Sequence, residues 1–151
     1  MEQGLFVVIE RSDAEQELLA EAAAFSECED SPLVVLRLLT SEDVEAVEST
    51  ELTSDIDRAQ FEDPVDHQFE EETTAFVEDS LDGAEPTHEV DIRIGSEGDR
   101  ARAILDAAAD HDCDHVFLVG KRRSPTGKAL FGDLTQEIIL DFDGSITLSM
   151  E

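Results

Sequence analysis

Short apolar runs alternate with longer amphipathic stretches along the whole chain. Of the five short segments, the first, second and fourth are continuous runs rich in branched side chains, which predict strands buried on both faces of a sheet. The third and fifth alternate apolar with polar positions, which predicts strands with one polar face. These segments are residues 5–9, 33–39, 87–94, 116–119 and the stretch around Ile146, Leu148 and Met150.

The intervening stretches have apolar residues at helical spacing, and their ends carry helix-capping residues. Ser12 followed by Glu15 has the spacing of a capping box, Ser96 with Asp99 opens a later helix, and Asp133 is an N-cap candidate for the last one. The predicted helices are residues 13–25, 61–81, about 96–111 and 133–140, while residues 41–59 are acidic, lack a clear period and predict a surface loop.

The resulting order of elements is β-α-β-α-β-α-β-α-β, which predicts an α/β fold. Such alternation gives a five-stranded, mostly parallel sheet with helices on both faces, joined by right-handed crossovers. Five strands favour an order close to that of flavodoxin over the six-stranded Rossmann order. No repeat or linker interrupts the pattern, so residues 1–151 form a single domain.

The net charge of the chain limits the environments and the binding partners that suit this protein. The chain has 39 acidic and 10 basic residues, a formal net charge of −29, which excludes indiscriminate binding of nucleic acid. Self-repulsion of this size opposes the compact state unless salt screens it. Because the acids are spread along the chain and not gathered in a tail, we interpret them as adaptation to a salty cytoplasm in preference to an acidic interaction surface.

Several classes of protein are disfavoured by what the sequence lacks. The N-terminus has no basic region ahead of its apolar run, and no stretch reaches the length of a membrane span, so a cytoplasmic protein without membrane contact is expected. Cys28 and Cys113 lack metal-ligand spacing, which favours idle thiols in a reducing compartment. The four histidines show no metal pattern, and no Gly-x-Ser-x-Gly elbow is present, so we assign no catalytic and no metal-binding residue.

The segment 120–132 is the strongest functional signal. Lys121, Arg122, Arg123 and Lys128 are four of the ten basic residues, and residues 115–132 form the longest stretch without Asp or Glu. Glycines let backbone amides approach an anion, and the following helix presents its positive end. A flexible, solvated basic turn is the plainer alternative. A Walker A loop is rejected because its first glycine and its magnesium-binding hydroxyl are missing.

This loop resembles the nucleotide-binding loop of the universal stress protein family. That family has Gly, two residues, Gly, nine residues and Gly-Ser/Thr between its fourth strand and fourth helix. Gly120 matches the opening glycine and Gly132 the closing one, and segment 124–128 resembles versions in relatives from salt-loving microbes. The family's Asp-Gly-Ser-like turn after its first strand corresponds here to residues 10–12, and residues 93–97 resemble its Gly-containing turn after the third strand.

The sequence departs from the family pattern at four points. Arg123 stands at the second glycine, the loop is one residue shorter, Asp133 replaces the Ser/Thr that would hold terminal phosphates, and Glu10 is longer than the expected Asp. A carboxylate at Asp133 would repel a phosphate if it faced the pocket, but it also makes a good helix N-cap.

The resemblance and the basic loop together predict a regulatory protein that binds ATP, another adenine nucleotide such as AMP, or a phosphorylated ligand. Lys128 and Arg123 would bind phosphates, Ser124 and Thr126 would donate hydrogen bonds, and Glu10 would approach the sugar or base. Any ATP hydrolysis would be slow, because no general base or metal site is evident. The predicted binding residues are Glu10, Ser12, Gly120, Arg123, Ser124, Thr126, Gly127, Lys128, Gly132 and Asp133.

Two predictions concern partners. The resemblance implies a homodimer that pairs through the last strand, at Ser145, Ile146, Leu148 and Met150, which would otherwise leave an apolar edge. The alternative function is an interaction module that binds no nucleotide and acts through a regulatory protein partner. A phosphate-metabolising enzyme is disfavoured because no nucleophile, base and metal converge in the sequence.

Overall fold

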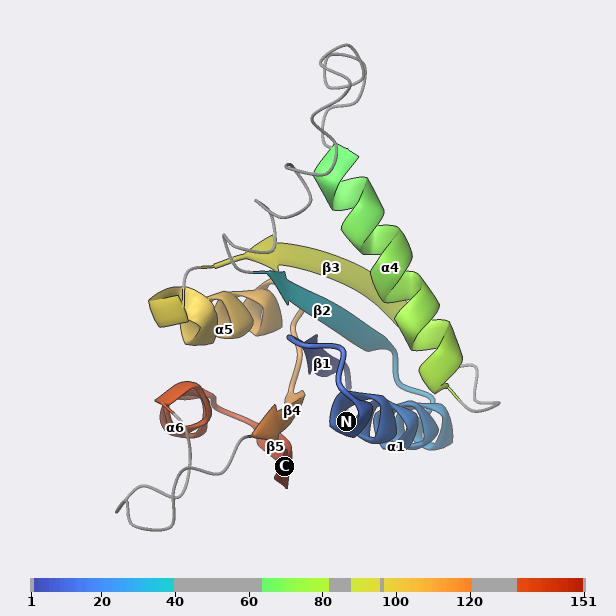
Figure 1. The fold of residues 1–151 in the computed structure, drawn as a ribbon. Coiled ribbons are helices and arrows are strands. Elements are labelled where there is room, and N and C mark those ends of the chain that lie inside the picture. Colours follow the sequence, from blue (N-terminus) through green and yellow to red (C-terminus); the bar gives the residue numbers. More distant parts are fainter. Residues whose placement is uncertain (1, 40–63, 82–87, 96, 121–132, 151) are drawn as a thin grey trace.

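The computed structural model describes residues 2–39, 64–81, 88–95, 97–120 and 133–150. Its sheet contains five parallel strands in the order β3-β2-β1-β4-β5 (Figure 1). The strands are β1 (Gly4–Val8), β2 (Leu33–Leu39), β3 (His88–Ile94), β4 (His115–Gly120) and β5 (Ser145–Met150). The helices are α1 (Asp13–Glu29), α4 (Pro64–Ser80), α5 (Arg100–Asp110), preceded by the 3₁₀ turn Glu97–Asp99, and α6 (Asp133–Asp141).

The α/β fold with helices on both faces is confirmed, and the apolar core forms one layer on each face of the sheet. One layer joins the sheet to α1 and α4 through Phe6, Leu19 and Val77. The other joins it to α5 and α6 through Leu36, Ile104 and Ile138. Every residue of β2 is buried, as are Leu5 to Val8 in β1, because both strands are covered on both sides.

The predicted strand order was wrong. The chain leaves β1 for β2 and β3 on one side, then returns to place β4 and β5 on the other side. This is the order of the first five Rossmann strands, and not the flavodoxin-like order. The third strand instead lies at an edge, where its alternating pattern fits: Val90 packs against one core layer, while Asp91 and Arg93 stay polar on the opposite face.

Element boundaries differ little from those predicted. Helix α1 extends to Glu29 and ends at Asp30, whose backbone is left-handed with φ 53°. The capping box of Ser12 and Glu15 is present. Asp99 stands at the start of α5 without a capping hydrogen bond, and α6 begins at Asp133 itself, so this residue lies inside the helix and not ahead of it.

Within the residues described, no helix combines the length and the apolar character needed to cross a bilayer. The predicted loop at residues 41–59 lies outside the described residues.

Candidate functional site

The direction in which strands are added to the sheet reverses between β1 and β4. From β1 the chain adds β2 and β3 on one side, and it then adds β4 and β5 on the other side. Ligands of open α/β sheets bind at such a point, beyond the carboxyl ends of the strands. Among the described residues, the ladder between these strands pairs Gly4 with His115 and stops at Phe6 with Phe117, although β1 continues to Val8 and β4 to Gly120. The two central strands therefore separate where a ligand would approach.

The turn after β1 is built around the carboxylate of Glu15. This side chain is 4% exposed, and its oxygens accept hydrogen bonds from the amides of Ile9 at 2.7 Å, Glu10 at 3.0 Å and Ser12 at 3.0 Å. In return, the Ser12 hydroxyl accepts from the Glu15 amide at 3.2 Å. The helix dipole of α1 favours a negative charge at this end. Ser12, predicted as a ligand contact, is thus engaged as a helix cap.

The carbonyl groups of the same turn bond to a buried cation. Arg37 lies on β2, directly beside Val8 in the sheet, and is 5% exposed. Its Nη1 donates to the carbonyls of Val8 at 3.3 Å and Leu38 at 3.3 Å, and also to that of Ile9. Sequence analysis missed Arg37, because a single Arg inside an apolar run carries no local signal of where its guanidinium reaches.

Two further features fix the turn to its surroundings. Arg11 has a left-handed backbone with φ 55°, a conformation uncommon for residues other than Gly, Asn and Asp. Its guanidinium pairs with the Glu72 carboxylate of α4 at 3.5 Å on the exposed surface. Glu10, predicted to contact the ligand's sugar or base, is exposed at the tip of this turn.

Gly120 closes β4 at a point of tight packing. A Cβ added here would lie 3.0 Å from Leu148 Cδ1, 3.1 Å from Met150 Sδ and 3.3 Å from Thr135 Oγ1. Most real Cβ atoms keep longer contacts, so a larger residue would require these side chains of β5 and α6 to shift by a few tenths of an ångström. The predicted loop glycine therefore also has a steric role in the fold.

The rest of the predicted site falls outside the described residues. These positions lie between Gly120 and α6, and the side chain of Asp133 at the start of α6 is likewise not described. They are Arg123, Ser124, Thr126, Gly127, Lys128 and Gly132.

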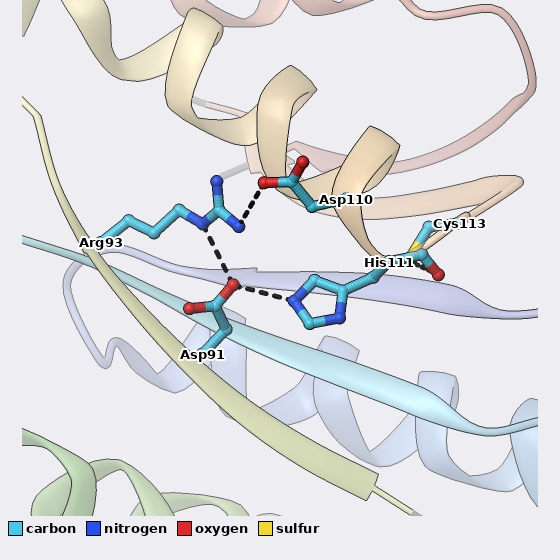
Figure 2. Close-up of polar contacts among 5 residues, drawn as sticks. All are labelled: Asp91, Arg93, Asp110, His111 and Cys113. Carbon is cyan, nitrogen blue, oxygen red and sulfur yellow. Dashed lines mark hydrogen bonds and ion pairs between the residues drawn. The ribbon is translucent and has the colours of Figure 1, made fainter.

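A second polar cluster, not predicted, joins β3 to the end of α5 (Figure 2). Asp91 Oδ2 accepts from Arg93 Nε at 3.0 Å and contacts His111 Nε2 at 2.9 Å, and Arg93 Nη2 donates to Asp110 Oδ2 at 2.8 Å. The sequence carries no signal for this cluster, because it joins residues of two elements that only the folded sheet brings together.

This cluster has no catalytic nucleophile. Burial, opposed in part by a hydrogen bond from Gln3, raises the pKa of the nearby Cys113 thiol to about 11, so it stays protonated and weakly nucleophilic at neutral pH. In the described parts of the chain, no three His, Cys, Asp or Glu side chains converge to hold a metal ion. The arrangement of these residues is that of a structural tether.

Solved structures support the fold. A universal stress protein from Archaeoglobus fulgidus superimposes with a TM-score of 0.65 at 19% identity, over 98% of each chain. The structure of that organism's universal stress protein with dAMP gives 0.62 at 15%, over 98% of this chain and 97% of that one. A universal stress protein in complex with cAMP gives 0.64 at 8%, over 99% and 96%.

No protein with a curated description matches the sequence. The model of the universal stress protein family matches residues 3–148, nearly the whole length. Together with the strand order and the separation of β1 from β4, this match shows that the chain belongs to the universal stress protein family.

Proposed function

We propose that this protein binds an adenine nucleotide, of the ATP or AMP type, or a related phosphorylated ligand, and acts as a regulator of the stress response. The proposal rests on the place of the basic segment in the chain, directly after β4. Segment 121–132, basic and free of acids, follows directly from β4 at the point where the central strands separate. Complexes of other universal stress proteins with cAMP and dAMP support the same class of ligand.

The roles of individual residues follow from their chemistry. Lys128 and Arg123 supply charge-assisted hydrogen bonds to phosphate oxygens, and Ser124 and Thr126 supply hydroxyl donors. Gly127 and Gly132 allow backbone amides to approach an anion. Any hydrolysis would be slow, because the sequence offers no evident general base or metal site.

Calorimetry with ATP, ADP and AMP in molar KCl tests this proposal. The Lys128→Ala and Arg123→Ala variants should each bind the nucleotide about tenfold more weakly, the effect of losing one charge-assisted contact. Arg102→Ala is the matched control, because Arg102 is exposed on α5. Absence of binding heat for all three nucleotides with the unmodified protein would reject nucleotide binding.

A second function is favoured by Asp133. Asp133 is the first residue of α6, at the end of the helix that would otherwise favour a terminal phosphate. In this alternative the protein is an interaction module that recognises an acidic protein partner through the same basic segment. If a partner co-purifies with the unmodified protein but not with Lys128→Ala, and added nucleotide does not change this result, the interaction module is supported. The same result would exclude the nucleotide as a regulator of that interaction.

We also propose a homodimer that pairs through β5. This strand lies at the edge of the sheet and contains no charged residue in a chain with 32% charged residues. Natural edge strands usually carry charges or Pro that prevent pairing. Ser149→Lys should shift the protein to a monomer in light scattering at high salt, whereas Asp143→Lys, just before β5, should not. A monomeric unmodified protein would contradict the dimer.

We place the protein in a salty cytoplasm. This proposal rests on the net charge of −29 and on the spread of the acids along the chain. The dependence of the protein's stability on salt concentration tests this proposal.

A further inference from the structure

One face of β5 has no helix over it among the described elements. On the side of α5 and α6, Ile146 and Leu148 of this strand pack against the core. The alternate residues point to the side of α1, because successive side chains of a strand face opposite ways. There, α1 packs over β1 and β4 (Figure 1), whereas Ser145, Thr147 and Ser149 of β5 keep part of their surface exposed.

Aromatic rings form a wall between α1 and this strand. The ring centroid of Phe25, on α1, lies 5.8 Å from that of His115 and 6.3 Å from that of Phe117, both on β4. His115 also bonds Thr147 of β5, with 2.7 Å between Nε2 and Oγ1. Although its ring packs against β4, Phe25 remains 40% exposed. An exposed ring therefore borders a row of small hydroxyl side chains.

This surface carries no charged side chain. We call its six residues the open face: Phe25, His115, Val119, Ser145, Thr147 and Ser149. None of the six is Asp, Glu, Lys or Arg, in a chain in which 32% of the residues are charged. At the other edge of the described sheet, β3 has Asp91 and Arg93 on its polar face. Since parallel sheets normally have both faces covered, the open face has the composition of a surface that another element covers.

Acids border the open face on α1 and just before β5. Glu21 precedes Phe25 by four residues, which places both on the same side of the helix, and it is exposed. Asp143 precedes Ser145 by two residues and is exposed as well. Such a border attracts Lys and Arg and repels phosphates, so nucleic acids and anionic membranes do not suit it. A cation is also favoured over the face of an exposed aromatic ring such as Phe25.

We propose that the open face docks an amphipathic helix of a partner protein, with an apolar stripe flanked by Lys and Arg. The stripe packs on Phe25 and on the small side chains of β5, and the cations pair with Glu21 and Asp143. The six residues of β5 span about 20 Å, the length of a helix of about 13 residues. This inference rests neither on nucleotide binding, which concerns the carboxyl ends of the central strands, nor on pairing through the edge of β5.

Fluorescence anisotropy with a synthetic peptide tests the proposal. The probe is a labelled Leu and Lys peptide of about 14 residues with Leu at helical spacing, and the control peptide has the same composition in an order that breaks the stripe. Molar KCl shortens the Debye length to about 3 Å, which suppresses general attraction between a cationic peptide and an acidic protein. The striped peptide should bind about tenfold more tightly than the control peptide. Equal binding of the two peptides, or no binding of either, would overturn the proposal.

Paired variants locate the binding surface. Phe25→Ala removes an apolar side chain from the open face, whereas Ile139→Ala removes one of similar exposure, 42%, from α6. Phe25→Ala should weaken binding of the striped peptide about tenfold, and Ile139→Ala by less than about twofold.

A second pair tests the charge of the border. Glu21→Lys and Glu27→Lys change the net charge equally, but Glu27 is two residues past Phe25 and therefore on nearly the opposite side of α1. Glu21→Lys should weaken binding about threefold or more, and Glu27→Lys by less than about twofold. Equal effects within either pair of variants would contradict docking on the open face.

NMR of the histidine rings gives a readout of position that does not depend on affinity. His115 belongs to the open face, whereas His111 contacts Asp91 at the other edge of the described sheet and His88 begins β3. The striped peptide should shift the ring signals of His115 and leave those of His88 and His111 unchanged. Absence of a shift at His115 in the peptide-bound protein would place the peptide elsewhere and overturn the proposal.

Discussion

At the scale of single residues, three non-glycine residues in the described part of the chain have a left-handed backbone, which glycine would adopt at lower cost. Arg11, Asp30 and Asp112 have φ of 55°, 53° and 52°. Asp30 follows α1, where its amide donates to the carbonyls of Ser26 and Glu27. An acid is poorly suited to this place, because a helix C-terminus carries a partial negative charge. The last turn of α1 has no basic residue to offset it.

Asp30→Gly should therefore stabilise the protein. Removing the steric cost of the left-handed Cβ and the repulsion from the helix end should raise the free energy of unfolding by about 0.5–1 kcal/mol. Urea unfolding in molar KCl measures the change. Glu27→Gly, which removes the same charge from within the helix, should instead lower it by about 1 kcal/mol. A loss of stability in Asp30→Gly would show that the aspartate has a role of its own.

His115 is the residue through which pH should act on stability. Its ring stacks on Phe117 with centroids 4.3 Å apart, and its Nε2 bonds Thr147 Oγ1 at 2.7 Å. Burial lowers the pKa of His115, and the nearby N-terminus lowers it further, while Asp114 acts in the opposite direction. The folded protein therefore resists the charging of this imidazole.

The sign of the effect follows from that lowered pKa. In the unfolded chain the imidazole protonates near pH 6.5, so below this pH the unfolded state binds the proton more readily and the stability falls. Above it, the contribution is fully present. The difference in unfolding free energy between the unmodified protein and His115→Gln should narrow as the pH drops from 7.5 to 5. NMR titration of the ring to a pKa above its ordinary value would contradict this prediction.

At the scale of elements, the edge strand β3 is tied to α5 by the cluster in Figure 2. Asp91 interacts with both Arg93 and His111, and Arg93 reaches Asp110 on the helix. The side chains of Asp91, Arg93 and His111 are 22%, 26% and 19% exposed, so water competes only partly for these hydrogen bonds. The cluster fixes the polar face of a strand that has no neighbour on its other side in the described sheet.

Asp91→Ala should loosen this contact. The loss of the acceptor for Arg93 and His111 should reduce the free energy of unfolding by about 1–2 kcal/mol. Hydrogen exchange should speed up first in β3 and the last turn of α5, because the edge is the least protected part of the sheet. Asp106→Ala, exposed on the same helix, should change neither quantity. Unchanged exchange in β3 would show that its pairing with β2 and the apolar contacts of Val90 and Ile92 hold the strand without this cluster.

At the scale of the whole molecule, the net charge of −29 sets the conditions under which the fold is stable. Repulsion among carboxylates acts over the Debye length, about 10 Å at 0.1 M salt and about 3 Å at 1 M. Folding brings these charges together, so it should be favoured by screening.

The midpoint of urea unfolding should therefore rise steeply between about 0.1 and 1 M KCl. NaCl should act alike, because screening depends on ionic strength and not on the cation. Sucrose stabilises folded proteins because it is excluded from their surface, and it does not screen charge. A comparison with sucrose therefore distinguishes stabilisation by screening from stabilisation by exclusion. Stability that is flat in KCl would remove the argument for a salty cytoplasm.

The candidate site was predictable only in part, for a reason that differs between its two sides. The basic segment after β4 is local in sequence, so clustering of Lys and Arg and the absence of acids were enough to single it out. The β1–α1 turn depends on Arg37, a residue from another strand, and on the three amides gathered by Glu15. Capping-box spacing revealed the pairing of Ser12 with Glu15, but not that the same carboxylate also binds Ile9 and Glu10.

The sequence by itself determined the fold class, the five strands and the alternation of helices, because hydrophobic periodicity is a local property that burial imposes on each element. The order of the strands, the separation of β1 from β4 and the tether at Asp91 were decided only by the tertiary structure. Each depends on which side of β1 a crossover places the next strand. That choice comes from the packing of distant elements against one another, which no short stretch of residues records.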